Sequence, residues 1–381
     1  MIQRLRSAGV CRMLAVSLEG VQSLGPTTAV GIVDASLLEE RNIHYESNNR
    51  RDGLWKPLVG QRDMRWPVLL EQVSQTKRHY GTQSSGSTGL VEDFRRYIAP
   101  CMQLSRIEKP IGTWLLAWPC FWSIGLAAPH GGPIDVYTLG LFGMGAILLR
   151  GSGCTVNDMW DSDFDKKVER TASRPLAAGT VTHRQALAWL GLQLSAGLGI
   201  LLQLNETSQL LGVASLPFVI AYPLMKRITG WPQAFLGLTI NWGAFMGWAA
   251  VHGSCSWEIV GPLYASGVFW TLVYDTIYAH QDTRDDVKAG VKSTALTFGE
   301  RTKPMLWGFA ACNIASMAVA GVMADCHGPF FIGMTAAAAQ LAWQIQTVNL
   351  TNPEDCARKF KSNWWYGCSI FAGIVADKLL S

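Results

Sequence analysis

Two clusters of oxygen-bearing side chains, each at the end of a long apolar run, contain the residue types that could do chemistry in this chain. In the first cluster they recur at positions i, i+4 and i+8, which lie on one face if a helix continues through them. Its members are Asn157, Asp161 and Asp165. In the second they recur at i, i+7 and i+11, again on one face, with a tyrosine adjacent. Its members are Asp275, Asp282 and Asp286, with Tyr278 beside them.

Oxygen ligands with no Cys or His among them suit Mg²⁺, which keeps several waters and usually bridges one or two carboxylates to a substrate phosphate. We therefore expect the two clusters together to hold magnesium on a diphosphate. Basic residues beside the clusters could neutralise the remaining phosphate charge. They are Arg150, Lys226, Arg227 and Lys292.

Three other interpretations fit parts of this pattern. A short acidic run is most often a solvated loop, but two such runs at equivalent ends of separate apolar segments argue against that. Residues 161–165 begin like an EF-hand loop, yet Lys166 stands at the glycine position and Ala172 at the glutamate position. Ionisable residues in membrane proteins can also line an ion pathway. A transporter would bury them near the midplane in broken helices, whereas these lie at helix ends beside basic loops.

The elements that must position the clusters are membrane-spanning helices. The charged fraction is 16%, against about 25% in an average soluble domain. From Ile111 onward, apolar segments near the ~20 residues needed to cross a bilayer follow one another, without the alternation of barrel strands. The sequence therefore predicts an all-α, polytopic membrane protein with about nine transmembrane helices. They lie near 110–128, 135–156, 183–203, 208–225, 232–251, 258–276, 303–323, 329–350 and 363–380.

The basic residues alternate between the connections. Connections after the even-numbered spans carry the Lys and Arg residues, and those after the odd-numbered spans carry none. The connections without Lys or Arg lie around 129–135, 205–209, 252–257 and 324–328. Because basic loops stay on the inner side of a membrane, the N-terminus and both acidic clusters are predicted on one side, the matrix in a mitochondrial protein.

The N-terminal region has a different composition. Residues 1–18 contain Arg4, Arg6 and Arg12 and no acidic residue, which is typical of a mitochondrial transit peptide, with a disordered basic tail as the alternative. We assign 1–40 to the transit peptide, with its cleavage point open, 41–95 to a polar linker and 96–381 to the membrane domain. The nine cysteines form no Cys-x-x-Cys pair and no Cys/His group at zinc spacing, which argues against a disulfide framework or a zinc site.

The motifs around both clusters resemble those of the UbiA superfamily of intramembrane prenyltransferases. The first signature, Asn-Asp-x-x-Asp-x-x-x-Asp, is matched by Asn157, Asp158, Asp161 and Asp165, with Arg150 upstream and Arg170, Arg174, Pro175 and Leu176 downstream. The second signature is matched by Asp275, Tyr278, Ala279 and Asp282, and continues through 285–288 and 290–294. Segments 106–112 and 222–227 also fit, so the resemblance covers about residue 95 to the end.

The resemblance implies helices arranged around a central, lipid-open cavity that holds a polyprenyl diphosphate and Mg²⁺. It implies transfer of the polyprenyl group to the ring carbon ortho to the hydroxyl of 4-hydroxybenzoate, in ubiquinone biosynthesis. The implied location is the mitochondrial inner membrane, with the active site facing the matrix. Implied partners are the donor, the acceptor, the lipid bilayer and other proteins of ubiquinone biosynthesis, with no nucleic acid among them.

The resemblance also distributes roles over the residues. The implied metal ligands are Asn157, Asp158, Asp161, Asp165, Asp275, Asp282 and Asp286. The implied diphosphate-binding residues are Arg150, Arg174, Lys226, Arg227 and Lys292. Asp161, Asp282 and Tyr278 are implied to be catalytic, Tyr278 through attraction of its ring to an allylic cation. Arg106 or Arg150 is implied to bind the acceptor carboxylate.

Several alternatives remain open. Sister enzymes that prenylate homogentisate, dihydroxynaphthoate or haem share the first signature, although the stretch 275–294 is most similar to the hydroxybenzoate branch. A cation transporter or an inactive membrane scaffold is a rival of another class. His280 could accept the phenol proton or simply pack, and Arg106 with Lys109 could anchor the first span at the interface. The isoprenoid length is not fixed by the sequence.

Overall fold

The computed structural model contains only helices as regular elements within the residues that it describes, which confirms the all-α prediction. These residues are 94–166, 171–283, 286–287 and 290–380, without the side chain of Phe164. The predicted transit peptide (1–40) and nearly all of the predicted linker (41–95) lie outside them, so both assignments stay predictions. Arg170, from the downstream motif, also lies outside the described residues.

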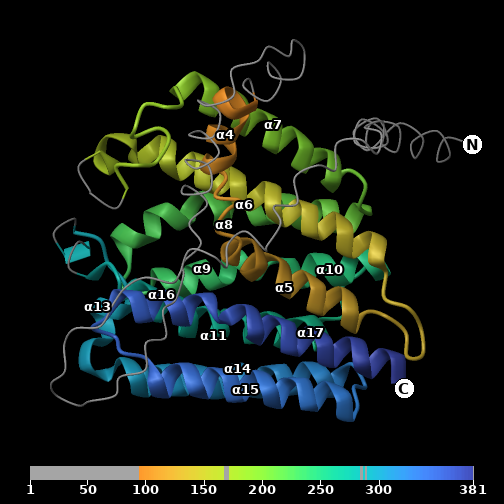
Figure 1. Cartoon of the computed structure of the whole chain (residues 1–381). Coiled ribbons are helices and arrows are strands. Elements are labelled where there is room, and N and C mark those ends of the chain that lie inside the picture. Colours follow the sequence, from red (N-terminus) through yellow and green to blue (C-terminus); the bar gives the residue numbers. More distant parts are fainter. Residues whose placement is uncertain (1–93, 167–170, 284–285, 288–289, 381) are drawn as a thin grey trace, which may run out of the picture. The chain divides into compact units, whose positions relative to one another are not determined.

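Most of the helices follow one another with short connections, and longer stretches separate α6 from α7 and α11 from α13 (Figure 1). They are η2 (Phe94–Ile98), α4 (Ala99–Leu104), α5 (Ile111–Leu126), α6 (Val136–Asp165), α7 (His183–Leu201), α8 (Glu206–Ile228), α9 (Pro232–Ile240), α10 (Gly243–His252), α11 (Trp257–Ala279), α13 (Thr294–Phe298), η3 (Gly299–Arg301), α14 (Thr302–Met323), α15 (Gly328–Thr347), α16 (Pro353–Lys361) and α17 (Asn363–Leu380).

Four helical stretches in the described part of the chain are long and apolar enough to cross a membrane. They are Val136–Asp163, Glu206–Ile228, Pro232–His252 and Thr294–Met323. The apolar helix α5 is shorter, and α7, α11, α15 and α17 coincide with other predicted spans. Helix α8 leaves most of its apolar length uncovered by protein, as a lipid-facing helix does. The polytopic class is confirmed, and the count of nine stays a prediction.

The predicted span at 232–251 is not one continuous helix, because it is interrupted between α9 and α10. Asn241 at the interruption is fully buried, and its Nδ2 donates a hydrogen bond to Oγ1 of Thr271 on α11 (2.9 Å). Just beyond it, a Cβ on Gly243 would collide with Cys120 on α5, so the close approach requires glycine. The interruption allows α9 to pack on α11 and α10 to pack on α5.

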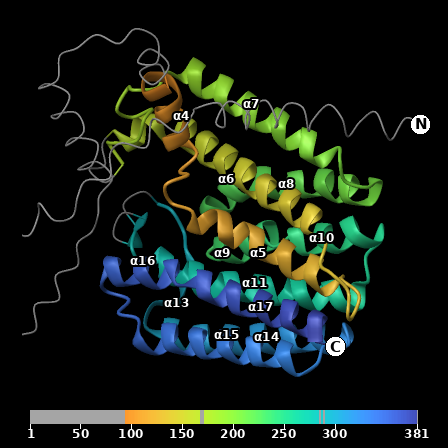
Figure 2. The same cartoon turned by 45° about the vertical axis from the view of Figure 1, so that its right-hand side comes forward.

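Helix α11 contacts α5, α9, α10, α13, α14 and α16, so it lies at the centre of the packing (Figure 2). Its Trp270 is fully buried, stacks on Tyr366 of α17 with ring centroids 4.8 Å apart, and donates its Nε1–H to Oδ1 of Asn363 (2.9 Å). The hydroxyl of Tyr366 donates to Oδ1 of Asn313 on α14 (2.9 Å). Buried aromatic rings with satisfied polar atoms thus fix α14 and α17 against α11, the element that carries the start of the second cluster.

The two ends of the helical region differ. The ends of α6 and α11, which carry the acidic clusters, lie at the end where Figure 1 shows α13 and α16. The C-terminal end of α17 and the connection between α5 and α6 lie at the opposite end. A candidate site built from both clusters is therefore confined to one end of the helices.

Candidate active site

Helix α6 runs without a break through the first cluster to Asp165, as the one-face spacing requires. The helix divides the cluster by burial. Asp158 is 1% exposed and Asp165 is buried, whereas Asn157 is exposed and Asp161 is partly buried. The first signature therefore has an inner pair, Asp158 and Asp165, and an outer pair, Asn157 and Asp161.

The inner carboxylates form ion pairs with two arginines from outside α6. Nη2 of Arg106 lies 2.7 Å from Oδ1 of Asp158. Nη1 of Arg174 lies 2.7 Å from Oδ2 of Asp165 and 3.4 Å from Oδ1 of Asp158. Because a buried carboxylate is costly unless it is paired, these contacts explain how two acids can face the protein interior.

Arg106 lies in the connection between α4 and α5, with a positive φ of 50°. Few residues other than glycine adopt such a backbone, so the contact with Asp158 stabilises a strained loop. Burial lowers the pKa of Arg106 and the negative charge of Asp158 raises it, and the net pKa lies above its ordinary value. Arg106 is also close enough to Tyr278 on α11 to interact with it electrostatically. The acceptor candidate Arg106 thus lies between the two clusters.

Lys226, near the end of α8, interacts electrostatically with carboxylates of both clusters. They are Asp161, Asp275 and Asp286. Its Nζ also lies 5.6 Å from the ring centroid of Tyr222, one turn earlier on α8. Asp275 is partly exposed, although its neighbours Tyr274 and Thr276 are buried. Lys226 of α8 therefore interacts with Asp161 of α6, Asp275 of α11 and Asp286 of the segment that follows α11.

Arg150 reaches the same region from α6, one turn or more before the first signature. It interacts electrostatically with Asp275 and Tyr222. Its guanidinium lies against the backbone of α5 at Gly112, where any Cβ would collide with it. Its Nε is buried and has no hydrogen-bond partner among the described residues. A buried N–H donor without a partner is rare and fits a group whose ligand is an anion.

The second cluster continues past the end of α11 into a segment that returns to α8. The N–H of Asp286 donates to the carbonyl of Asp282 (2.8 Å), and both residues are partly buried. The N–H of Lys292 donates to the carbonyl of Lys226 (2.8 Å), and its Nζ donates to the carbonyl of Ile228 (3.2 Å). Lys292 thus binds the C-terminal end of α8, while Arg227 is exposed on the same end.

Side chains outside the two signatures, Gln233 and Phe360, contact residues of the second signature. Oγ1 of Thr294 lies 2.7 Å from Oγ1 of Thr276 on α11, and the N–H of Thr294 donates to Oε1 of Gln233 on α9 (2.9 Å). On the other side, Phe360 of α16 packs on Tyr278 with ring centroids 4.4 Å apart. Their partners lie far away in the chain, so the only local signal was the Ser-Thr pair that ends the second signature.

His280 immediately follows α11. Its Nδ1 lies 2.8 Å from the carbonyl oxygen of Thr276, and because a carbonyl only accepts, Nδ1 carries the hydrogen. Nε2 is then the basic nitrogen. Burial lowers the pKa of His280. The neutral form is therefore favoured, which is compatible with either predicted role, as a proton acceptor or as a packed, hydrogen-bonded side chain.

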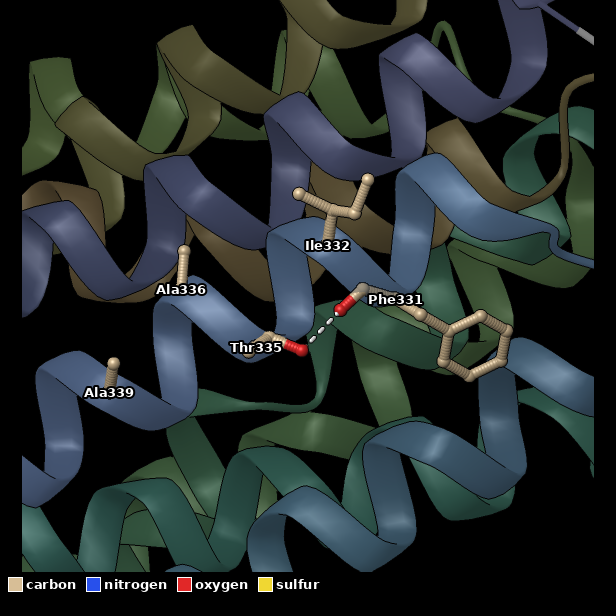
Figure 3. Close-up of a pocket in the computed structure, with 5 residues that line it drawn as sticks. All are labelled: Phe331, Ile332, Thr335, Ala336 and Ala339. Atoms are coloured by element: carbon tan, nitrogen blue, oxygen red, sulfur yellow. Dashed lines mark hydrogen bonds between the residues drawn. The ribbon is translucent and has the colours of Figure 1, made fainter.

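A surface pocket on α15 lies apart from this site (Figure 3). It is lined by Phe331, Ile332, Thr335, Ala336 and Ala339. The hydroxyl of Thr335 is bonded to the carbonyl of Phe331 within the helix (2.8 Å), and the lining has no charged group. A depression of this composition suits apolar chains of a bilayer and offers nothing to a diphosphate.

Comparison with known proteins agrees with this arrangement. Residues 116–367 match the UbiA prenyltransferase family. The chain is 58% identical to the mitochondrial 4-hydroxybenzoate polyprenyltransferase of Arabidopsis thaliana, over 76% of this chain and 70% of that protein. It is 54% identical to the protein of the same name from Homo sapiens, over 78% and 80% of the two chains.

Solved structures have the same fold. A UbiA homolog from Aeropyrum pernix K1 superposes with a TM-score of 0.60 at 23% identity, over 69% of this chain and 97% of that one. A UbiA homolog from Archaeoglobus fulgidus, bound to GPP and Mg²⁺, gives a TM-score of 0.51 at 16% identity, over 71% and 99%. The fold defines an all-helical membrane protein. The chain belongs to the UbiA prenyltransferase family.

Proposed function

We propose that the chain transfers a polyprenyl group from polyprenyl diphosphate to 4-hydroxybenzoate, at the ring carbon ortho to the hydroxyl, in ubiquinone biosynthesis. The observation that carries the proposal is that Lys226 interacts electrostatically with carboxylates of both acidic clusters, in a chain 54–58% identical over its aligned residues to mitochondrial 4-hydroxybenzoate polyprenyltransferases. The family supplies the reaction class, and the relatives' names supply the acceptor.

Magnesium fits the residues at the site. The outer side chains of the two clusters offer amide and carboxylate oxygens only, which is the ligand set that Mg²⁺ prefers. Asn157, Asp161, Asp275, Asp282 and Asp286 would hold it, while Asp158 and Asp165 keep their inward oxygens on arginines. When bound, the ion stabilises negative charge on the leaving diphosphate. A UbiA homolog of the same fold was solved with GPP and Mg²⁺, which supports this choice of metal.

The basic residues would bind the rest of the diphosphate. Arg150 has a buried Nε that needs an acceptor, and Lys226 already lies among the carboxylates that would share the ion. Arg174 is held by Asp165 and also interacts electrostatically with Asp161, and Arg227 and Lys292 are the further candidates. Cations that are fixed before the substrate arrives stabilise the departing diphosphate without reorganising during the reaction.

Bond breaking and bond making then balance within the two substrates. The allylic C–O bond breaks and its electron pair leaves with the diphosphate. The ring carbon of 4-hydroxybenzoate forms the new C–C bond and loses its proton. The Tyr278 ring, held by Phe360, can attract the positive allylic carbon through its face. The acceptor carboxylate would be bound by Arg106, which contacts Asp158, or by Arg150, which interacts electrostatically with Asp275.

We place the protein in the mitochondrial inner membrane with this site facing the matrix. The relatives are named as mitochondrial, and the basic connections lie at the end of the helices that carries the site. A donor whose tail is a long hydrocarbon is dissolved in the bilayer, so a lipid-open cavity between the helices is the expected route of entry. Other enzymes of ubiquinone biosynthesis are proposed partners because they consume the prenylated product.

An acceptor panel tests the proposed function. Membranes that contain the chain are incubated with Mg²⁺, labelled polyprenyl diphosphate, and 4-hydroxybenzoate, homogentisate, dihydroxynaphthoate or haem. Labelled product on 4-hydroxybenzoate is expected. Product on another acceptor alone would reassign the branch, and ion flux without any product would favour the transporter.

A further inference from the structure

Three side chains with metal-binding atoms meet at the end of the helices opposite to the candidate active site. His130 follows α5, His327 precedes α15, and Asp377 lies in the last turn of α17. One ligand atom from each lies within 4.8 Å of the others. The two imidazole rings are edge to face, with centroids 5.5 Å apart and planes at 84°. We propose that this group, the His–His–Asp cluster, binds a divalent cation of the zinc type.

Backbone hydrogen bonds hold the three segments together independently of any ion. The N–H of His327 donates to Oδ1 of Asp377 (2.7 Å), and the N–H of Gly131 donates to the carbonyl of Lys378 (2.9 Å). Asp377 is 1% exposed, and both histidines are exposed. The buried carboxylate is thus aimed at two histidines that solvent can reach, with Oδ2 as the oxygen that a cation would take.

A neighbouring lysine contacts one of the two ring nitrogens of His130. Nζ of Lys378 lies 3.2 Å from Nε2 of His130. An ammonium group can only donate, so Nε2 presents its lone pair there. Lys378 is only 2% exposed, so its ammonium group lies between the protein interior and a nitrogen of the exposed His130. A divalent cation would replace this ammonium as the positive partner of the histidine and the carboxylate.

The ligand chemistry distinguishes this cluster from the acidic clusters. Two imidazoles with one carboxylate suit Zn²⁺, which binds such ligands at about 2.0–2.2 Å and accepts water as its fourth ligand. Ligands around one ion at that distance are roughly 3–4 Å apart, so the side chains must close slightly from their present spacing. Bound zinc would tie the end of α17 to the connections before α6 and α15.

Sequence spacing could not reveal this site. The Cys/His patterns that mark zinc sites are local, whereas these ligands come from three connections or helix ends far apart in the chain. The close packing of α15 on α17 brings two of them together, since a Cβ on Gly333 would meet the carbonyl of Ser369. The expectation that the chain has no zinc site therefore applies to local motifs only.

Zinc binding to the purified full-length chain in detergent tests the proposal. Bound zinc and the thermal midpoint are measured during a titration with ZnCl₂ in a chelator-buffered solution. We expect one zinc per chain and a higher midpoint in the wild type. The control is the Asp161→Ala, Asp282→Ala double variant, which lacks outer carboxylates of the acidic clusters and should bind zinc unchanged.

Ligand variants should lose this effect. His130→Gln and His327→Gln alter exposed side chains, so their folding can be checked by gel filtration, and each should weaken zinc binding by more than the roughly 10–100-fold that loss of an outer partner causes. Wild-type affinity in both variants, or zinc binding that disappears only in the Asp161→Ala, Asp282→Ala control, would overturn the proposal.

A substitution of Lys378 distinguishes a metal site from a group of side chains that only form hydrogen bonds to one another. Lys378→Met keeps the length and burial of the side chain and removes the competing ammonium. Zinc should then bind more tightly than in the wild type, while the midpoint without zinc falls or stays the same. Weaker or absent zinc binding in a folded Lys378→Met variant would contradict the exchange of a lysine for a metal ion.

Discussion

Asp158 and Asp161 lie three residues apart in one signature, and their different contacts indicate different roles. Asp158 is buried against Arg106, whereas Asp161 is partly buried and interacts electrostatically with Lys226, which also interacts with Asp275 and Asp286 of the second cluster. A carboxylate that must release an arginine before it can bind an ion is a poor first ligand. We therefore assign the inner acids chiefly to positioning arginines and the outer acids to the ion and the diphosphate.

Loss of an outer carboxylate should remove activity and spare the fold. Asp161→Ala should lower prenyl transfer by at least about a hundredfold, because stabilisation of the leaving diphosphate is lost. Asp163→Ala is the matched control, since Asp163 is exposed two residues away and contacts Lys166 (2.8 Å). Initial rates in membranes, normalised to folded protein, measure the effect. A near-normal rate for Asp161→Ala would exclude this residue from the site.

A methyl group at Gly112 should displace the guanidinium of Arg150. Gly112→Ala adds a Cβ that collides with that side chain, and a misplaced catalytic group can lower the rate by up to about a hundredfold. Gly153→Ala, on α6, is the control because nothing lies near the added Cβ. Alanine favours helix over glycine by about 1 kcal/mol, so neither change should unfold its helix. Equal rates for the two variants would argue against a role for Arg150.

At the scale of elements, helix α16 borders the site, because its Phe360 packs on Tyr278. The first turn of α16 is held by Asp355. The N–H of Asn349 donates to Oδ2 of Asp355 (2.7 Å), and Arg358 pairs with its other oxygen. The Asn349 hydrogen bond, aided by Arg358, holds the pKa of Asp355 below its ordinary value. The carboxylate should therefore stabilise the start of α16 at neutral pH.

The lowered pKa of Asp355 predicts how the stability of the protein depends on pH. The pKa of Asp355 in the folded protein lies below its value in the unfolded chain, which is about 3.9. The ionised carboxylate therefore contributes its full stabilisation above about pH 3.9, and this contribution is lost as the pH falls through the folded pKa. The thermal midpoint of the wild type should exceed that of Asp355→Asn at pH 6.5, and the gap should narrow by pH 3. A gap that is constant or widens on acidification would be inconsistent with this pairing.

Periodicity predicted the element that matters most, since α6 continues through Asp165 as the spacing of the first cluster requires. The interruption between α9 and α10 could not be predicted, because the partner of Asn241 is Thr271 on another helix. The ion pairs of Asp158 and Asp165 were hidden for the same reason. Local sequence predicts which face a residue occupies, whereas tertiary packing decides whether that face meets an arginine or the site.

For the whole molecule, the distribution of charge gives the two ends of the helices separate roles. One end gathers the basic connections and both acidic clusters, and the other has connections without Lys or Arg and the His–His–Asp cluster. By the positive-inside rule we propose that the end with the basic connections faces the matrix. The number of spans and the two N-terminal segments stay predictions.

The central claim is that the two acidic clusters form one magnesium-dependent site for polyprenyl transfer to 4-hydroxybenzoate. The most direct measurement is the formation of labelled 3-polyprenyl-4-hydroxybenzoate by the purified full-length chain in lipid vesicles as Mg²⁺ is varied. We predict product that rises with Mg²⁺, disappears when the metal is chelated, and is absent in both Asp161→Ala and Asp282→Ala. Undiminished product after chelation, or in either variant, would contradict the account.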